Sequence, residues 1–341
     1  MRFMTNTRSM LCAAVLLLTT ASPGAGQVME GPDGPVEFVG LKEWRARDLF
    51  EAIQELAPDQ PFHACAAVME LELGFAEAAA MSYRTRGSDE VYTVVVGVED
   101  LTRVRYRAVG SETLGLPDTW RKLKATAEED LYILTSAART LHSREDTEWI
   151  GADPEVLEEV WTRIDRADGR RDHRLAHELL ARDVSWSARA IATLVLGNFM
   201  DRDTSWHGLV LSLTDPEDRV THVAQSLLQG LIYSDSRRPV EWSAAREPLL
   251  AHFGGTNPWS FDLVLRVLVA TEVDPEFGRQ LARERPDLLL AYAGAEHRGT
   301  RQPAIAFLRT VSGEDFGTDL QAWTAWINGQ SDDRDQSPPA R

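Results

Sequence analysis

One cysteine in this sequence has a setting that could support thiol chemistry. Cys65 lies in the stretch HACAAVMELELGF (63–75), close to an expected helix start, where the helix dipole would lower the pKa of a thiol. His63, the nearest possible base, is two residues away, and side chains at that spacing on a helix point apart. We therefore expect a buried structural thiol. A thiol enzyme that uses Cys65 is the alternative.

That alternative is based on a stretch further along the chain. The sequence VYTVVVGVEDLTRVRYR (91–107) resembles the histidine-bearing strand of bacteriocin-processing-type cysteine peptidases. The resemblance implies a degenerate peptidase-like module with Cys65 as its nucleophile. The chain departs from that family at two places. Ala66-Ala67 follow the cysteine in place of Gly-Pro, and Tyr92 stands where the family's histidine would begin the strand.

Two histidines have the spacing of metal ligands. His173 and His177, in DHRLAHELL, are at i and i+4, so a helix would place both on one face. The glutamate of the metalloprotease pattern is missing between them, since Glu178 lies just outside. A packed or solvated helix face is therefore expected, with no metal site. The sequence also has no glycine-rich phosphate loop and no Gly-x-Ser-x-Gly motif, so we expect no catalytic residue and no cofactor.

Three tryptophans follow expected helix starts, in VSWSAR, DTSWHG and NPWSFD. These are Trp186, Trp206 and Trp259, and Trp242 in VEWSAA is similar. One interpretation is a hydrophobic staple that fixes each turn. The other is an exposed row of aromatic side chains that binds a partner protein, because tryptophan is enriched at interface hot spots. Trp186, Trp206 and Trp259 are thus the candidate partner-binding residues.

The N-terminus indicates export. Arg2 and Arg8 precede a short apolar run, Met10 to Thr20, and small residues follow it up to Gly26. This order is typical of a secretory signal peptide over residues 1–26, with cleavage before Gln27, and the run is too short to span a bilayer. The expected location is periplasmic or extracellular, without membrane insertion after cleavage. Only Cys65 would then remain, so no intramolecular disulfide could form.

The charge of the chain argues against two classes of partner. Cleavage would remove two arginines and no acidic residue, so the formal net charge of −17 would become −19. Such an acidic protein repels nucleic-acid phosphates and anionic lipid headgroups. We expect a protein partner; the oligomeric state is left open.

Over residues 36–108 the apolar residues recur partly at helical and partly at strand spacing, which predicts a small α+β module. Helical spacing covers 41–56 and 64–73, while β-branched and aromatic residues predict strands at 80–84 and 91–98. The strictly alternating RVRYR (103–107) predicts a third strand.

From residue 117 to 328 the pattern is helical, beginning with a long amphipathic stretch, Asp118 to Leu141. Asp-Pro-Glu recurs at 153–155, 215–217 and 274–276, and Asp183 falls between the first two. This tripeptide favours a helix start through its capping carboxylate, N-terminal proline and acidic first turn. Helix starts that recur at this regular spacing predict stacked helical hairpins.

Two segments carry the clearest internal match. DVSWSARAIATLVLGNF (183–199) aligns with DPEDRVTHVAQSLLQGL (215–231), which places Ala192 on Ala224 and Leu196 on Leu228. The segments resemble the HEAT-repeat (armadillo-type) family in its short bacterial form, over roughly residues 150–328. The matching residues are Ala188-Arg189, Ala192, Leu196-Gly197, Asp215, Val220, Ala224 and Leu227, with Thr221 in place of an arginine. The resemblance implies a protein-binding α-solenoid and no catalytic residue.

The predicted fold is therefore mainly α, an α-solenoid of HEAT-like hairpins (117–328) after a small α+β module, with a disordered tail at 329–341. The last helix should close the solenoid. Trp323, Trp326 and Ile327 share one helical face, and Gly313 is placed to end the preceding helix. The order Ser-Gly, Phe-Gly, Trp-x-x-Trp also resembles the last unit of bacterial HEAT-repeat proteins. We expect this face to cover the end of the core.

Overall fold

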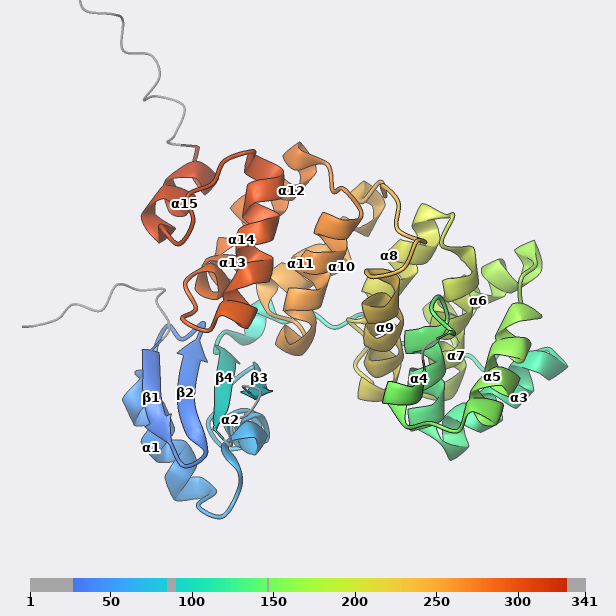
Figure 1. The fold of residues 1–341 in the computed structure, drawn as a ribbon, viewed down its shortest axis with the longest axis horizontal. Coiled ribbons are helices and arrows are strands. Elements are labelled where there is room, and N and C mark those ends of the chain that lie inside the picture. The colour runs from blue at the N-terminus through green and yellow to red at the C-terminus, as the bar shows by residue number, and fades with distance from the viewer. Residues whose placement is uncertain (1–26, 85–89, 146, 330–341) are drawn as a thin grey trace, which may run out of the picture.

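A computed structural model describes residues 27–84, 90–145 and 147–329. Within these ranges the chain forms fifteen α-helices and one four-stranded sheet at the N-terminal end (Figure 1). A mainly helical protein with a small N-terminal α+β unit is thus confirmed. The predicted signal peptide and nearly all of the predicted tail (330–341) lie outside the described residues.

The sheet has the strand order β1-β2-β4-β3. Its strands are β1 (Gln27–Gly31), β2 (Gly34–Val39), β3 (Glu77–Arg84) and β4 (Val91–Val98). β2 and β4 are parallel, and the other neighbouring pairs are antiparallel. Two helices, α1 (Ala46–Leu56) and α2 (Cys65–Leu71), follow the β1–β2 hairpin. The predicted strands β3 and β4 and both predicted helices are present, whereas the hairpin was not predicted, because glycine and proline occupy its turn.

Both faces of the sheet are covered, which explains the unbroken apolar run in β4. Val95 packs with β2 and the helices α1 and α2 on one face, whereas Val94 and Val96 pack into the core of the helical part on the other. Alternate residues of a strand point to opposite faces, so a strand buried on both sides must be apolar throughout. The module and the helices therefore share one continuous packing interface.

A buried carboxylate fixes this interface. Glu37 of β2 is fully buried and accepts hydrogen bonds from the backbone amides of Glu296 and His297 at 2.5 and 2.9 Å. These amides lie at the N-terminus of α14 (Arg298–Ser312), which carries the positive end of the helix dipole. The His297 ring stacks near Tyr83 and Tyr92, with centroids 3.9 and 4.9 Å apart. The sheet is thus attached to the C-terminal end of the helical part.

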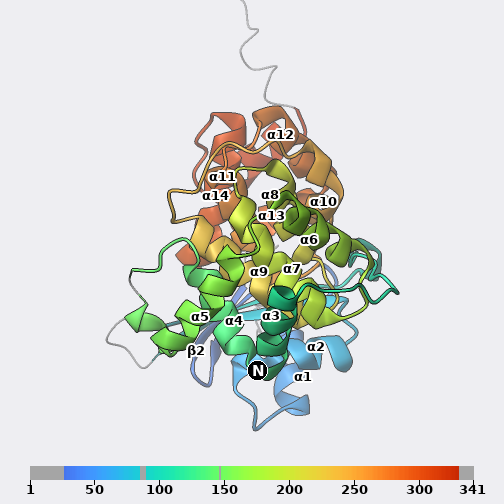
Figure 2. The same ribbon diagram turned by 90° about the vertical axis from the view of Figure 1, so that its right-hand side faces the viewer.

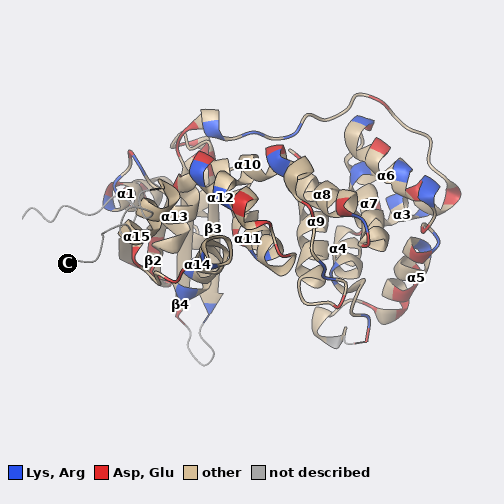
Figure 3. Cartoon of the chain, turned by 90° about the horizontal axis from the view of Figure 1, so that it is seen from above, with Lys and Arg blue, Asp and Glu red and all other residues tan. Residues whose placement is uncertain are grey.

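The predicted strand at 103–107 is wrong. Residues 103–116, which we call the strap, form an extended segment with no strand pairing apart from one isolated bridge, Glu112 to Asp183. The strap returns along one side of the helices toward α3 (Figure 3). Its backbone amides donate hydrogen bonds to the helical part at successive points. The Arg105 amide donates to Thr256 Oγ1 at 2.7 Å, and the Arg107 amide donates to the Thr214 carbonyl at 2.9 Å. The alternating side chains of RVRYR therefore contact the helices and do not belong to a sheet.

Four helix pairs make up most of the helical part, α6–α7, α8–α9, α10–α11 and α12–α14, while α3 packs on α7 and α4 packs on α9. The first helices of these pairs pack on one another in sequence order, as do the second helices, which produces two rows (Figure 2). The bounds of the helices in this part are α3 (Asp118–Glu129), α4 (Leu131–Thr140), α5 (Pro154–Asp165), α6 (Arg170–Arg182), α7 (Trp186–Leu196), α8 (Asp203–Ser212), α9 (Asp218–Leu231), α10 (Arg246–Gly254), α11 (Phe261–Ala270), α12 (Pro275–Glu284), α13 (Pro286–Ala293) and α15 (Leu320–Ile327).

The expected helix starts are confirmed at two of three places. Asp153 and Asp274 cap α5 and α12, each accepting a backbone hydrogen bond at 2.9 Å. The third tripeptide behaves differently, since α9 begins only at Asp218 and Asp215 is buried in the turn before it. The long helix expected over 118–141 is also two helices, because Asp130 interrupts it and caps α4. A short local motif thus determines where a helix starts, unless its carboxylate takes part in a tertiary contact instead.

The closing helix buries the face that its sequence predicts. Trp323, Trp326 and Ile327 are all buried, whereas Gln321 on the opposite face is exposed. Gly313 ends α14 in the left-handed conformation with φ 73°. α15 packs on α12 and α13, so it covers one end of the helical core.

Candidate functional site

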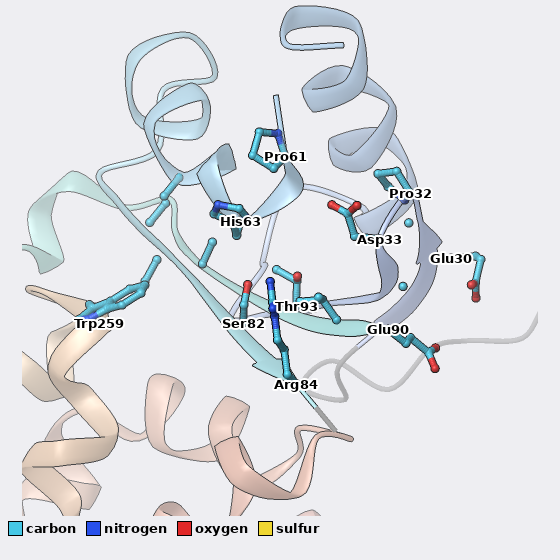
Figure 4. Close-up of a pocket in the computed structure, with 17 residues that line it drawn as sticks. Glu30, Pro32, Asp33, Pro61, His63, Ser82, Arg84, Glu90, Thr93 and Trp259 are labelled. Atoms are coloured by element: carbon cyan, nitrogen blue, oxygen red, sulfur yellow. The ribbon is translucent and has the colours of Figure 1, made fainter. Parts of the chain in front are cut away.

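A cleft of about 1030 Å³ lies at one end of the sheet. The β1–β2 turn, the short helix Phe62–Ala64 and the strands β3 and β4 form its walls, and Trp259 closes one end. Figure 4 shows His63, Ser82, Arg84 and Thr93 around its centre. The cleft is therefore built by both the module and the helical part.

Small side chains on β3 create this space. Ala78, Ala80 and Ser82 alternate along the strand and line the cleft, so they share one face of the sheet. None of them reaches far above the backbone. A ligand could therefore approach the sheet closely at this face.

Charge is unevenly distributed along the cleft. Glu30, Asp33 and Glu90 lie at the end formed by the β1–β2 turn, opposite Trp259 (Figure 4). Arg84 lies between these two ends. The cleft thus has an acidic end and an aromatic end.

The polar groups of the cleft are not arranged as a catalytic unit. Among the described residues, no hydrogen bond joins His63 to Ser82 or Thr93. Nucleophilic catalysis by a hydroxyl requires such a base within hydrogen-bonding reach. In the described part of the cleft, Ser82 and Thr93 therefore have no histidine paired with them.

Trp259 also lines a second, smaller cleft of about 160 Å³ on the helical part. This cleft lies between α4, α9 and α11, and its wall includes Arg139, Tyr233 and Arg266. The Trp259 side chain is 50% exposed and Tyr233 is 76% exposed. Trp259 therefore joins two adjacent hollows and offers aromatic surface to both.

The turn that carries Trp259 is firmly held. Gln225 of α9 donates to Ser260 Oγ at 2.6 Å, and the Tyr292 hydroxyl donates to the Pro258 carbonyl at 3.0 Å. Both contacts come from neighbouring helices and flank the tryptophan. The exposed ring is thus presented by a rigid turn, which limits the entropy lost on binding.

The other two candidate tryptophans have different surroundings. Trp206 is fully buried, with its Nε1 donating to the Met200 carbonyl at 3.0 Å, so it has no surface with which to contact a partner. Trp186 is partly buried, and the Arg219 guanidinium lies 3.9 Å from its ring centroid. The three residues therefore do not form one exposed row. Trp259 lines both clefts described above, and its role in partner binding stays a prediction.

Cys65 is a buried free thiol at the first residue of α2. Desolvation by burial raises the pKa of this thiol to about 12. A nucleophilic cysteine needs the opposite shift, because the thiolate is the reactive form. His63 is exposed, and no hydrogen bond connects it to the thiol in the described part of the chain. The expected structural surroundings of Cys65 are thus observed.

Cys65 should resist alkylation in the folded protein. The raised pKa leaves little thiolate at neutral pH, and the residue is only 2% exposed. Labelling with a water-soluble maleimide should therefore be slow until denaturant is added. Mass spectrometry of native and denatured samples measures this difference. Rapid labelling of the native protein would revive the thiol-enzyme alternative.

His173 and His177 lie one turn apart on α6, with their rings in contact next to α8. Their Nε2 atoms are 3.3 Å apart, and the His173 Nε2 atom is 3.2 Å from Ser205 Oγ. Burial, together with the neighbouring histidines, lowers the pKa of His177 to about 4. No third histidine, cysteine or carboxylate completes a metal site anywhere in residues 27–84, 90–145 and 147–329. The pair belongs to the packing of these two helices.

Comparisons of this chain with known proteins found no match. No family model, no curated protein and no solved structure matches it. Within the described ranges, no helix has both the length and the apolar character needed to cross a membrane.

Proposed function

We propose that this protein is an exported, non-enzymatic scaffold that binds a segment of a partner protein in the cleft beside Trp259. The observation that carries the proposal is the half-exposed Trp259 ring, held on a rigid turn between two hollows. Interfaces centre on such aromatic residues in well-formed pockets.

The arrangement of the helices supports a HEAT-like α-solenoid. First helices pack on first helices and second helices on second, over four consecutive pairs. The internally matched segments become equivalent second helices, α7 and α9, and all four aligned positions are fully buried: Ala192, Leu196, Ala224 and Leu228. Stacked hairpins of this type commonly serve as extended binding surfaces.

The charge distribution of the cleft indicates the chemistry of the bound segment. An apolar or aromatic side chain would pack on Trp259, while a basic side chain would reach Glu30 and Asp33 at the other end. The negative net charge of the chain would attract such a basic segment from a distance.

Trp259→Ala should weaken partner binding about thirtyfold without unfolding the protein. Truncating a hot-spot tryptophan costs about 2 kcal/mol or more of binding free energy, which is roughly a thirtyfold loss of affinity. The measurement is recovery of partners from the exported fraction on immobilised wild-type and variant protein, with affinity for the recovered partner then determined by titration.

Leu71→Ala provides the control. Leu71 is 80% exposed and lines neither cleft, so its truncation should change neither recovery nor thermal stability. If Trp259→Ala recovers the same partners with the same affinity as the wild type, the cleft is not the binding site. The buried Cys65 thiol gives the alternative of a thiol enzyme no support.

A further inference from the structure

A separate cavity of about 330 Å³ lies between the strap and the ends of α10 and α12. Its charged lining consists of four arginines and two glutamates: Arg103, Arg105, Arg246, Arg285, Glu247 and Glu284. These groups have a surplus of two positive charges, in a chain whose net charge is −17. None of them lines the clefts beside Trp259. The lining of this cavity is therefore positively charged, although the protein as a whole is acidic.

The three alternating arginines of the strap differ in their partners. Arg107 binds the carboxylate of Asp215 at 2.5 Å, and Arg103 lies 3.4 Å from the carboxylate of Asp287. Arg105, between them, has no ion pair and no side-chain hydrogen bond with any described residue. Around Arg105 the neighbouring helices supply Arg246 and Arg285 to the cavity, together with Glu247 and Glu284.

A second arginine of the cavity is equally unpaired. Arg285, between α12 and α13, is half-buried, and its guanidinium has no partner in the part of the chain that the structure describes. Arg246 differs, because Glu284 and Glu247 both lie within ion-pair distance of its guanidinium. The two glutamates are therefore used by Arg246. Arg105 and Arg285 supply the surplus charge.

We propose that this cavity binds an oxyanion, a carboxylate or a phosphate group, held by Arg105 and Arg285. Guanidinium groups present planar pairs of N–H donors that match both kinds of group in a bidentate manner. Arg103, only 10% exposed, adds positive charge at the inner wall. The volume admits a small anion or a single acidic side chain.

Calorimetric titration of the full chain tests this site, with inorganic phosphate and succinate as separate probes and chloride holding the ionic strength constant. At least one probe should bind saturably. Arg105→Gln and Arg285→Gln should each weaken that binding roughly tenfold or more, since each removes charge-assisted hydrogen bonds. Their melting temperatures should equal that of the wild type, because neither guanidinium has an intramolecular partner.

Arg174→Gln is the charge-matched control. Arg174 is exposed on α6, pairs with no described residue and lines none of the cavities named here, so its loss changes the net charge equally. Binding should be unaffected in this variant. Saturable binding of phosphate alone or succinate alone would identify the preferred oxyanion. No saturable binding of either probe, or equal weakening by all three variants, would overturn the proposal.

Discussion

Trp323→Ala should destabilise the protein by about 3–5 kcal/mol, the range for truncating a fully buried tryptophan. Trp323 is 0% exposed and forms edge-to-face contacts with Phe316 and Trp326. Its Nε1 also donates to the Gly317 carbonyl at 3.0 Å, so truncation leaves a cavity and an unpaired carbonyl. Because α15 covers the last pair of helices, the loss should spread from this end. Thermal and urea unfolding measure the effect.

Gln321→Ala is the matched control on the same helix. Gln321 is exposed, and its side chain makes no hydrogen bond in the described structure, so the change should cost under about 0.5 kcal/mol. Equal unfolding midpoints for Trp323→Ala and the wild type would mean that the tryptophan faces water in solution.

Asp215→Asn should cost about 3–5 kcal/mol, because it leaves two buried guanidinium groups without their counter-charge. The Asp215 side chain is 0% exposed and pairs with Arg107 of the strap and Arg189 of α7, at 2.5 and 2.8 Å. Both arginine side chains are themselves at most 6% exposed. This cluster joins the strap to the turn before α9. Urea unfolding of the variant at neutral pH measures the loss.

The same cluster predicts a pH dependence. Burial alone would raise the pKa of Asp215, but the hydrogen bonds from Arg189 and the charge of Arg107 outweigh it and lower this pKa. The stabilisation is therefore fully present above the ordinary aspartate pKa of about 3.9 and is lost as the pH falls through the lower folded-state value. The difference in stability between wild type and Asp215→Asn should narrow below about pH 4. A difference that stays constant with pH would contradict this assignment.

Asp165→Asn is the control for the buried cluster. Asp165 pairs with Arg144 through two hydrogen bonds at 2.7 and 2.8 Å, but its side chain is 50% exposed. Solvent screens such a pair, so its loss should cost less than about 1 kcal/mol. An equally large loss in both variants would show that burial does not distinguish the two pairs.

Elements with a strong local pattern could be predicted from the sequence. The apolar face of α15, the caps Asp153 and Asp274, and the left-handed Gly313 all depend on residues within a few positions of one another. Local periodicity and backbone preference set such features, and the structure contains them. The equivalence of α7 and α9 could also be predicted from the sequence, because each copy of a repeat must bury the same positions.

Only the tertiary structure decided the site. Trp206 and Trp259 lie in similar local sequences, yet Trp206 is fully buried and Trp259 is half-exposed, because their surroundings in the fold differ. RVRYR has a strand's alternation, but no strand edge is paired with it, and Arg103 and Arg107 instead meet carboxylates far along the chain. The pKa of Cys65 likewise depends on the core around it and not on its place at a helix start. Exposure, ion pairing and desolvation arise from contacts between distant segments, and a local sequence pattern does not contain them.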